Sequence, residues 1–132
     1  MIIDPSAVLA MIYAEAEAEI FLKLITQYQP CLLASPSYVE LSIVLGTRHG
    51  EKGLKNLDLL LKELSITVVP FTPKQAQLGA EAFLKFGKGR HPAKLNMGDC
   101  FSYALAKNTG QPLLFKGNDF SRTDIDLVEN ED

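Results

Sequence analysis

Short apolar segments alternate along this chain with longer segments whose apolar residues recur at helical spacing, and this alternation restricts the folds available to it. Short buried strands separated by helices form a parallel sheet that is covered on both faces. The sequence therefore predicts an α/β fold, a three-layer α/β/α sandwich around a central, mostly parallel sheet of four or five strands. The expected strands are 1–3, 31–34, 66–69 and 113–115, with 125–128 as the candidate fifth; the expected helices are 5–13, 15–28, 36 to 46 or 50, 54–64, 73–86 and 97–108.

Length and composition set the class of protein. A chain of 132 residues is expected to form one domain, residues 1–132. No apolar run approaches the roughly 20 residues needed to cross a bilayer, and the start MIID lacks the basic region of a signal peptide. Cys31 and Cys100 are too few for a disulfide framework, and we expect buried thiols in a reducing, cytoplasmic environment. The net charge of −3 argues against nonspecific coating of nucleic acid.

Four acidic residues are expected at one edge of the sheet. Asp4 ends the first strand, and Asp119 follows the fourth. Glu40 lies in the first turns of the helix after the second strand, and Asp99 lies in the first turn of the helix that precedes the fourth. Because parallel strands end at one edge and helices begin there, all four carboxylates should meet at the carboxyl edge, where ligands of such sheets bind.

Each of these acids also has an ordinary structural explanation. Asp4 before a proline is a good helix N-cap, and Asp99 three residues after Asn96 resembles a capping box. Glu40 would favour the dipole of its helix, and Asp119 could be a turn residue. No structural rule, however, requires all four at the same edge.

A cation would relieve the repulsion among clustered carboxylates, one of which would otherwise become protonated. Oxygen ligands without a nearby set of histidines or cysteines suit Mg²⁺ or Mn²⁺. Asp124 is a candidate fifth acid on the same rim. Such an ion activates a bound water and screens a phosphate, so the pattern indicates hydrolysis at phosphorus.

Positive charge is concentrated in one part of the chain. Seven basic and two acidic residues lie between positions 85 and 122, a net of +5, so the remainder carries −8. This segment surrounds the predicted metal site, which suits a polyanionic substrate. Arg90, Lys94, Lys116 and Arg122 are the candidate substrate-binding residues; the alternative is a solvated loop.

The two N-terminal helices and the leucine-rich helix at 54–64 offer more apolar surface than one thin sheet needs. These faces form either core or a groove for a partner helix.

Three stretches carry a family resemblance: MIIDPSAVLAMI, SPSYVELSIVL and GRHPAKLNMGDCFSYALAKNTGQPLLFKGNDFSRTDI. With them the chain resembles the PIN domain family, and within it the VapC-like ribonuclease toxins of type II toxin–antitoxin pairs. The family's acidic set falls on Asp4, Glu40, Asp99 and Asp119, and its polar residue after the first aspartate falls on Ser6. The resemblance implies Mg²⁺- or Mn²⁺-dependent endonucleolytic cleavage of RNA, inhibition by a cognate VapB-like antitoxin, and a homodimer.

Other α/β classes fit less well. A receiver domain needs an acidic pair after its first strand, and a haloacid-dehalogenase-like phosphatase needs Asp-x-Asp there; Asp4-Pro5-Ser6 satisfies neither. The remaining alternative is a catalytically silent PIN domain that acts as an RNA- or protein-binding scaffold. Loss of an acid would favour the scaffold, and the presence of all four favours an active enzyme.

Overall fold

The computed structural model describes residues 1–128, in which the central sheet has four strands. They are β1 (Ile2–Ile3), β2 (Cys31–Ala34), β3 (Ile66–Val69) and β4 (Leu113–Leu114), in the order β3-β2-β1-β4. Every neighbouring pair is parallel, and Ile2 of β1 is in register with Leu32 and Leu113. The candidate fifth strand is reduced to a single parallel bridge between Leu113 and Leu127.

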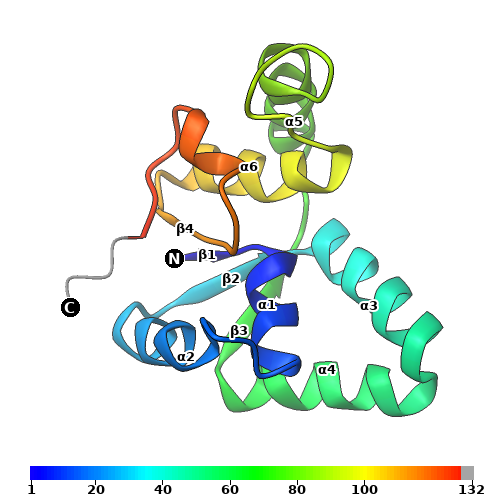
Figure 1. Ribbon diagram of the computed structural model, residues 1–132. Helices are drawn as coiled ribbons and strands as arrows, with labels where there is room; N and C mark the ends of the chain where they lie inside the picture. Colours follow the sequence, from blue (N-terminus) through cyan, green and yellow to red (C-terminus); the bar gives the residue numbers. More distant parts are fainter. Residues whose placement is uncertain (129–132) are drawn as a thin grey trace.

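Within residues 1–128, six α-helices cover the two faces of this sheet, which confirms the predicted three-layer α/β/α sandwich (Figure 1). One layer contains α1 (Pro5–Ile12), α2 (Ala18–Gln27), α3 (Ser35–His49) and α4 (Glu51–Glu63). The other contains α5 (Pro73–Phe86) and α6 (Met97–Thr109), followed after β4 by a short 3-10 helix, η1 (Phe120–Arg122). None of these helices, within residues 1–128, has the length and apolar character needed to span a membrane.

The two short strands β1 and β4 are buried on both sides. Successive side chains of a strand point to opposite faces, so Ile3 and Leu114 join the core with α1–α4. Ile2 and Leu113 join the core with α5 and α6. Since both faces are covered, these strands can be continuously apolar, which is the pattern from which they were predicted.

Several helix boundaries differ from the sequence-based expectation. The second helix begins at Ala18 instead of 15, because Ala14 adopts a left-handed φ of 50° and the following acidic residues form a turn. The fourth begins at Glu51, three residues early. Ser35 is already helical and Ala34 precedes it as N-cap, so the third helix begins one residue before the expected position 36. The capping box expected at Asn96 is confirmed, and Thr72 forms a second capping box at the start of α5.

The strand order reverses at β1. The chain moves outward from β1 through β2 to β3, and then returns to place β4 on the other side of β1. In open parallel sheets ligands bind where the order reverses in this way, at the carboxyl ends of the strands. Asp4 directly follows β1, and the loop after β4 carries Asp119.

Candidate active site

Asp4 is the most buried of the four predicted acids, with a relative exposure of 4%. It is the N-cap of α1, and its Oδ2 accepts a hydrogen bond from the backbone N–H of Ser6 at 3.0 Å. Its Oδ1 accepts a 2.6 Å hydrogen bond from the hydroxyl of Ser102, a fully buried residue of α6. The capping role expected for Asp4 is therefore present, and Ser102 fixes the side chain from a second helix.

Ser102 holds a site carboxylate and was not identified from the sequence. It lies one turn after Asp99 on α6, and a polar residue inside the otherwise apolar run of that helix is the only signal that points to it. A residue that orients a metal ligand typically contributes roughly 10- to 100-fold to affinity or activity.

We expect Ser102→Ala to lower the RNA cleavage that the family resemblance implies by about tenfold or more, since Asp4 loses the donor that orients it. It should also lower the free energy of unfolding by about 1–3 kcal/mol, because a buried carboxylate oxygen loses its partner. Urea unfolding and cleavage rates measure both effects. Ser37→Ala is the matched control: Ser37 is equally buried, and its hydroxyl has no hydrogen-bond partner among residues 1–128. Equal losses in both variants would contradict the assignment.

Glu40 and Asp99 approach each other across α3 and α6. The carboxylate of Glu40 lies directly against Gly98, the residue before Asp99. Asp99 takes part in a capping box, in which Asn96 N–H donates to Asp99 Oδ2 at 2.9 Å and Asp99 N–H donates to Asn96 Oδ1 at 2.8 Å. The predicted structural role of Asp99 is therefore confirmed, but the capping bond uses only Oδ2, one of the two oxygens of the carboxylate.

Asp119 and Ser6 complete the rim from the β4 side. Asp119 is exposed and precedes η1 without making a side-chain capping bond. Ser6, in the first turn of α1, accepts a 2.9 Å hydrogen bond from the backbone N–H of Lys116 through its hydroxyl. This bond ties the start of α1 to the loop that carries Asp119.

The four carboxylates interact electrostatically. Burial raises the pKa of Asp4, and the charge of Asp119 adds to this, although hydrogen bonds from Ser102 and Ser6 oppose it. Burial and the charge of Asp4 raise the pKa of Glu40. Burial raises the pKa of Asp99 to about 7, with contributions from Asp4, Asp119 and Glu40 and against the hydrogen bond from Asn96. The structure therefore brings all four predicted acids together.

This donor set fits a divalent cation. Carboxylate oxygens are the ligands that Mg²⁺ and Mn²⁺ prefer, and like charges held close together favour an intervening cation. Within residues 1–128 no three acidic, histidine or cysteine side chains converge closely enough to enclose an ion by themselves. Mg²⁺ usually takes only one or two carboxylates directly and keeps several waters, so a looser ring of acids still suits it.

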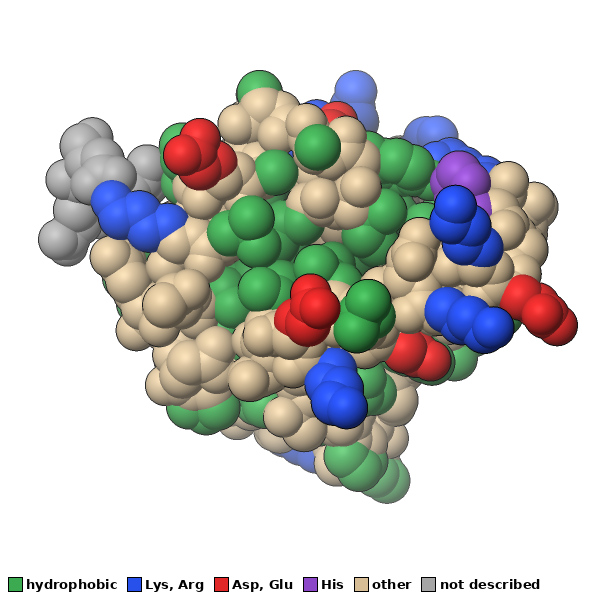
Figure 2. Space-filling model, turned by 90° about the horizontal axis from the view of Figure 1, so that it is seen from below, with side chains coloured by type: hydrophobic (Ala, Val, Ile, Leu, Met, Phe, Trp, Pro, Cys, Tyr) green, Lys and Arg blue, Asp and Glu red, His purple; other side chains and the backbone are tan. Residues whose placement is uncertain are grey.

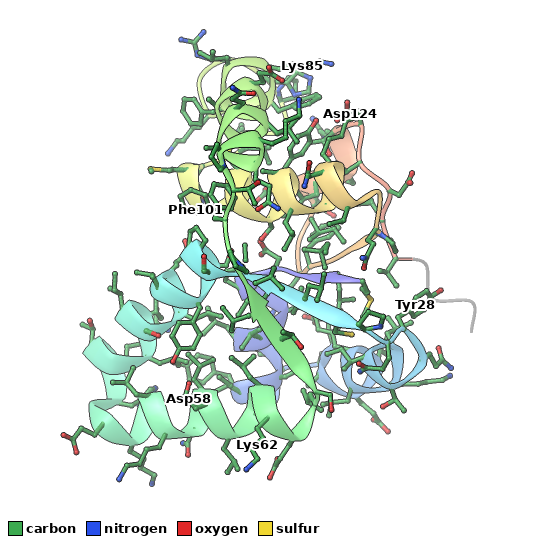
Figure 3. All side chains as sticks on the ribbon, turned by 180° about the vertical axis from the view of Figure 1, so that it is seen from behind. Tyr28, Asp58, Lys62, Lys85, Phe101 and Asp124 are labelled. Atoms are coloured by element: carbon green, nitrogen blue, oxygen red, sulfur yellow. The ribbon has the colours of Figure 1, made fainter. Side chains whose placement is uncertain are left out.

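Asp124 does not join this group. It accepts hydrogen bonds from Tyr103 and from Lys107, which also forms a 3.1 Å ion pair with it. Figure 3 shows Asp124 beside the part of α6 that lies away from Phe101, and therefore away from the first turn of that helix. Although burial opposes it, these hydrogen bonds lower the pKa of Asp124. Its contacts attach the segment after η1 to α6.

The predicted substrate-binding residues fall into two groups. Lys116 is ion-paired with Glu15, and with Glu17 at 3.2 Å, so its charge is already neutralised by the turn between α1 and α2. Arg90, Lys94 and Arg122 are exposed and form no ion pair with any residue in 1–128. Arg90 and Lys94 belong to a loop that is closed at its base by a bridge between Gly87 and Leu95 and leads directly into the capping box of α6.

Comparisons with known proteins agree with this architecture. A family model described as PIN domain matches residues 1–126. The chain is 46% identical over 128 residues to ribonuclease VapC30 of Mycobacterium tuberculosis, covering 97% of this chain and 98% of that protein. The crystal structure of M. tuberculosis VapC20, described as a sarcin–ricin loop cleaving toxin, has a TM-score of 0.75 at 15% identity over 98% of both chains. A toxin–antitoxin complex from Klebsiella pneumoniae has a TM-score of 0.67 at 14% identity, covering 92% of this chain and 90% of that one; these two likenesses concern the fold.

A parallel α/β sandwich with acids gathered at the strand-order reversal is the architecture of a PIN domain, and the chain belongs to the PIN domain family. Its full-length relatives, 39–46% identical, are named VapC ribonucleases. The chain accordingly groups with the VapC ribonucleases, and the family predicted from the three sequence stretches is confirmed.

Proposed function

We propose that this protein is a Mg²⁺- or Mn²⁺-dependent endoribonuclease that hydrolyses phosphodiester bonds of RNA. The observation that carries the proposal is the electrostatic coupling of Asp4, Glu40, Asp99 and Asp119 at the carboxyl edge of the sheet. These four carboxylates would hold the ion. When bound, the ion lowers the pKa of a water and screens the charge of the phosphate.

The chain's own residues would orient the reactants. Ser102 keeps the carboxylate of Asp4 in one position, and the capping box keeps Asp99 in another. Ser6 is hydrogen-bonded both to Asp4 and to the loop after β4, and its hydroxyl would contact a phosphate oxygen of the substrate. The N-terminal amides of α1 and α6 at the same edge add to the attraction for an anion.

Purified protein should cleave RNA in the presence of Mg²⁺ or Mn²⁺ and lose this activity when EDTA removes the ion. Electrophoresis of a defined single-stranded RNA, labelled at one end, reports internal cleavage directly. Adding back Mn²⁺ should restore cleavage. An RNA that is bound but never cut, with or without metal, would instead favour the alternative, a catalytically silent scaffold.

We further propose that Arg90, Lys94 and Arg122 contact the RNA backbone. Their support is that they are exposed cations without an acidic partner in the described chain, near the acids in sequence and fold. Lys116 contributes less to this proposal than the sequence suggested, because Glu15 and Glu17 already neutralise it.

Affinity for single-stranded RNA should fall with salt, because phosphate contacts release counterions. Arg90→Ala should reduce the slope of log affinity against log salt by about 0.7, the value for one phosphate contact on a single strand. Lys116→Ala should change it less. Lys52→Ala serves as the control, since Lys52 is exposed on α4, far from the loop of Arg90 (Figure 1). Fluorescence anisotropy at several salt concentrations gives the slopes. Identical slopes for all variants would show that the loop of Arg90 faces solvent and does not contact the RNA backbone.

We propose that a cognate VapB-like antitoxin binds the layer formed by α1, α2 and α4. Figure 2, which views the molecule from below, shows hydrophobic side chains gathered on that face with acidic and basic groups around them. Exposed large hydrophobic residues on α2 and α4 include Ile20, Leu22, Leu54 and Leu59. An amphipathic helix suits such a surface, and a basic residue on the partner would complement the nearby acids.

A homodimer is the second assembly that we propose. Its support is an apolar pocket of about 360 Å³ between α5 and α6, lined by residues that include Phe71, Phe83 and Phe101. Met97 on α6 and Leu84 on α5 are 71% and 61% exposed, and large apolar side chains exposed beside an apolar pocket are typical of a surface that binds another chain.

The single domain proposed for 1–132 includes 129–132, which lie outside the described residues. Two free, buried cysteines fit a cytoplasmic location.

A further inference from the structure

Gly98 is the second residue of α6 and lies between exposed Met97 and the acid Asp99. A β-carbon at Gly98 would stand 2.2 Å from Oε1 of Glu40, 3.0 Å from its Cδ and 3.2 Å from its Oε2. Separations below about 3.0 Å do not occur for real β-carbons, so the carboxylate of Glu40 occupies the space that any side chain at position 98 would need.

The backbone does not require glycine at this position. Gly98 is helical and is not among the glycines with positive φ, which are Gly50, Gly89, Gly110 and Gly117. In a helix, glycine is less favourable than alanine. A glycine kept in a helix without a conformational need therefore indicates close approach of another group.

The approaching group is a functional carboxylate, not the backbone of a packed element. At Gly53 and Gly87 the nearest atoms are backbone oxygens, of Leu45 at 2.4 Å and Phe83 at 2.3 Å, so those glycines serve helix packing and a turn. At Gly98 all three nearest atoms belong to the carboxylate of Glu40. The space at Gly98 is thus fitted to Glu40 alone.

We propose that Gly98 is a positioning residue, whose missing side chain lets the Glu40 carboxylate rest against the first turn of α6 and join the metal-binding acids. The inference rests on the proposed function, in which Glu40 helps to hold the ion. The Asn96–Asp99 capping box fixes the backbone around Gly98, so an added methyl group is accommodated by movement of Glu40. The flexible end of a long side chain yields more readily than a capped helix.

The test compares Mn²⁺ affinity, measured by titration calorimetry on the full chain, with the melting temperature of the metal-free protein. Gly98→Ala should weaken Mn²⁺ binding by roughly 10- to 100-fold, as changes that misplace a ligand do. Its metal-free melting temperature should not fall, because alanine favours the helix and only a side-chain end is displaced. Gly46→Ala is the matched control: Gly46 lies on α3, the helix of Glu40, and a β-carbon there meets Leu54 at an ordinary 3.5 Å. It should bind Mn²⁺ like the native chain.

A double-mutant cycle with Glu40→Ala separates positioning from a general disturbance of α6. Once the carboxylate is gone, Gly98→Ala should cause no further loss of Mn²⁺ affinity and should raise the melting temperature. Native affinity in Gly98→Ala, or an equal loss of affinity in both backgrounds, would overturn the inference while the proposed function stands. A native chain that binds no Mn²⁺ and cuts no RNA would overturn the proposed function, and the inference with it.

Discussion

Asp99→Asn should lower RNA cleavage at saturating Mg²⁺ by at least about a hundredfold, beyond the roughly 10- to 100-fold typical of residues that only orient a ligand. The amide retains an oxygen that can accept the hydrogen bond from Asn96, but it removes the charge that the ion requires. Single-turnover cleavage of a labelled RNA measures the loss. Asp58→Asn makes the same change on α4, where Asp58 accepts a hydrogen bond from Tyr38, and should leave the rate unaltered. Full activity in Asp99→Asn would remove this residue from the site.

The same variant should not weaken the metal-free fold. The pKa of Asp99 is raised from 3.8 to about 7 by burial and the neighbouring acids. Between these values the folded chain binds this proton and the unfolded chain does not, so the contribution of Asp99 to stability falls as the pH rises from about 4 to about 7. Asp99→Asn lacks this decline and should be as stable as the native chain, or more so, at pH 8. Urea midpoints at pH 5 and pH 8 test this; a destabilisation above about 1 kcal/mol would mark Asp99 as mainly a structural cap.

Mn²⁺ should raise the melting temperature of the native protein by roughly 10 °C when free ion exceeds its dissociation constant a hundredfold. Binding to the folded state alone adds about 2.7 kcal/mol at that excess, and about 1 kcal/mol moves the melting temperature of a domain of this size by a few degrees. An ion held by Asp4, Glu40, Asp99 and Asp119 would also screen the repulsion among them.

Melting curves recorded with EDTA and with Mn²⁺ provide the measurement. Asp99→Asn should show much less of the gain than the native chain, because it lacks one of the charges that hold the ion. If both proteins gain equally, the ion stabilises the fold from another place and the four acids are not its site.

The features that could be predicted from sequence are those fixed by local chemistry. Strands β2 and β3 agree with their predicted ranges, because short β-branched or apolar runs between turn residues have few other conformations. The capping boxes at Thr72 and Asn96 can also be recognised in the sequence, since each residue is followed three positions later by the glutamine or aspartate that completes the box. Convergence of the acids followed from one topological rule for parallel sheets.

The features that could not be predicted depend on contacts between distant parts of the chain. Ser102 donates a hydrogen bond to Asp4, which is 98 residues away in the sequence, and no pattern in either segment indicates that these two residues are in contact. The ion pairs of Lys116 link the loop after β4 to the turn after α1. The contacts of Asp124 depend on how the segment after η1 lies along α6. Charge and spacing identified these residues as candidates, but only the packed structure shows which partner each has taken.

The four acids reside on segments that leave the ribosome at widely separated times. Of the four acids, Asp4 and Glu40 are synthesised first, and Asp119 is synthesised last, after the strand that precedes it. A nascent chain therefore lacks a complete acidic set until residue 119 has emerged, although α1, α2 and α4 are finished by residue 63. The antitoxin proposed to bind those three helices would therefore be able to engage the growing polypeptide before the proposed active site is complete. The order of the elements thus leaves an interval during synthesis in which the proposed partner would meet its helices before the acidic set is complete.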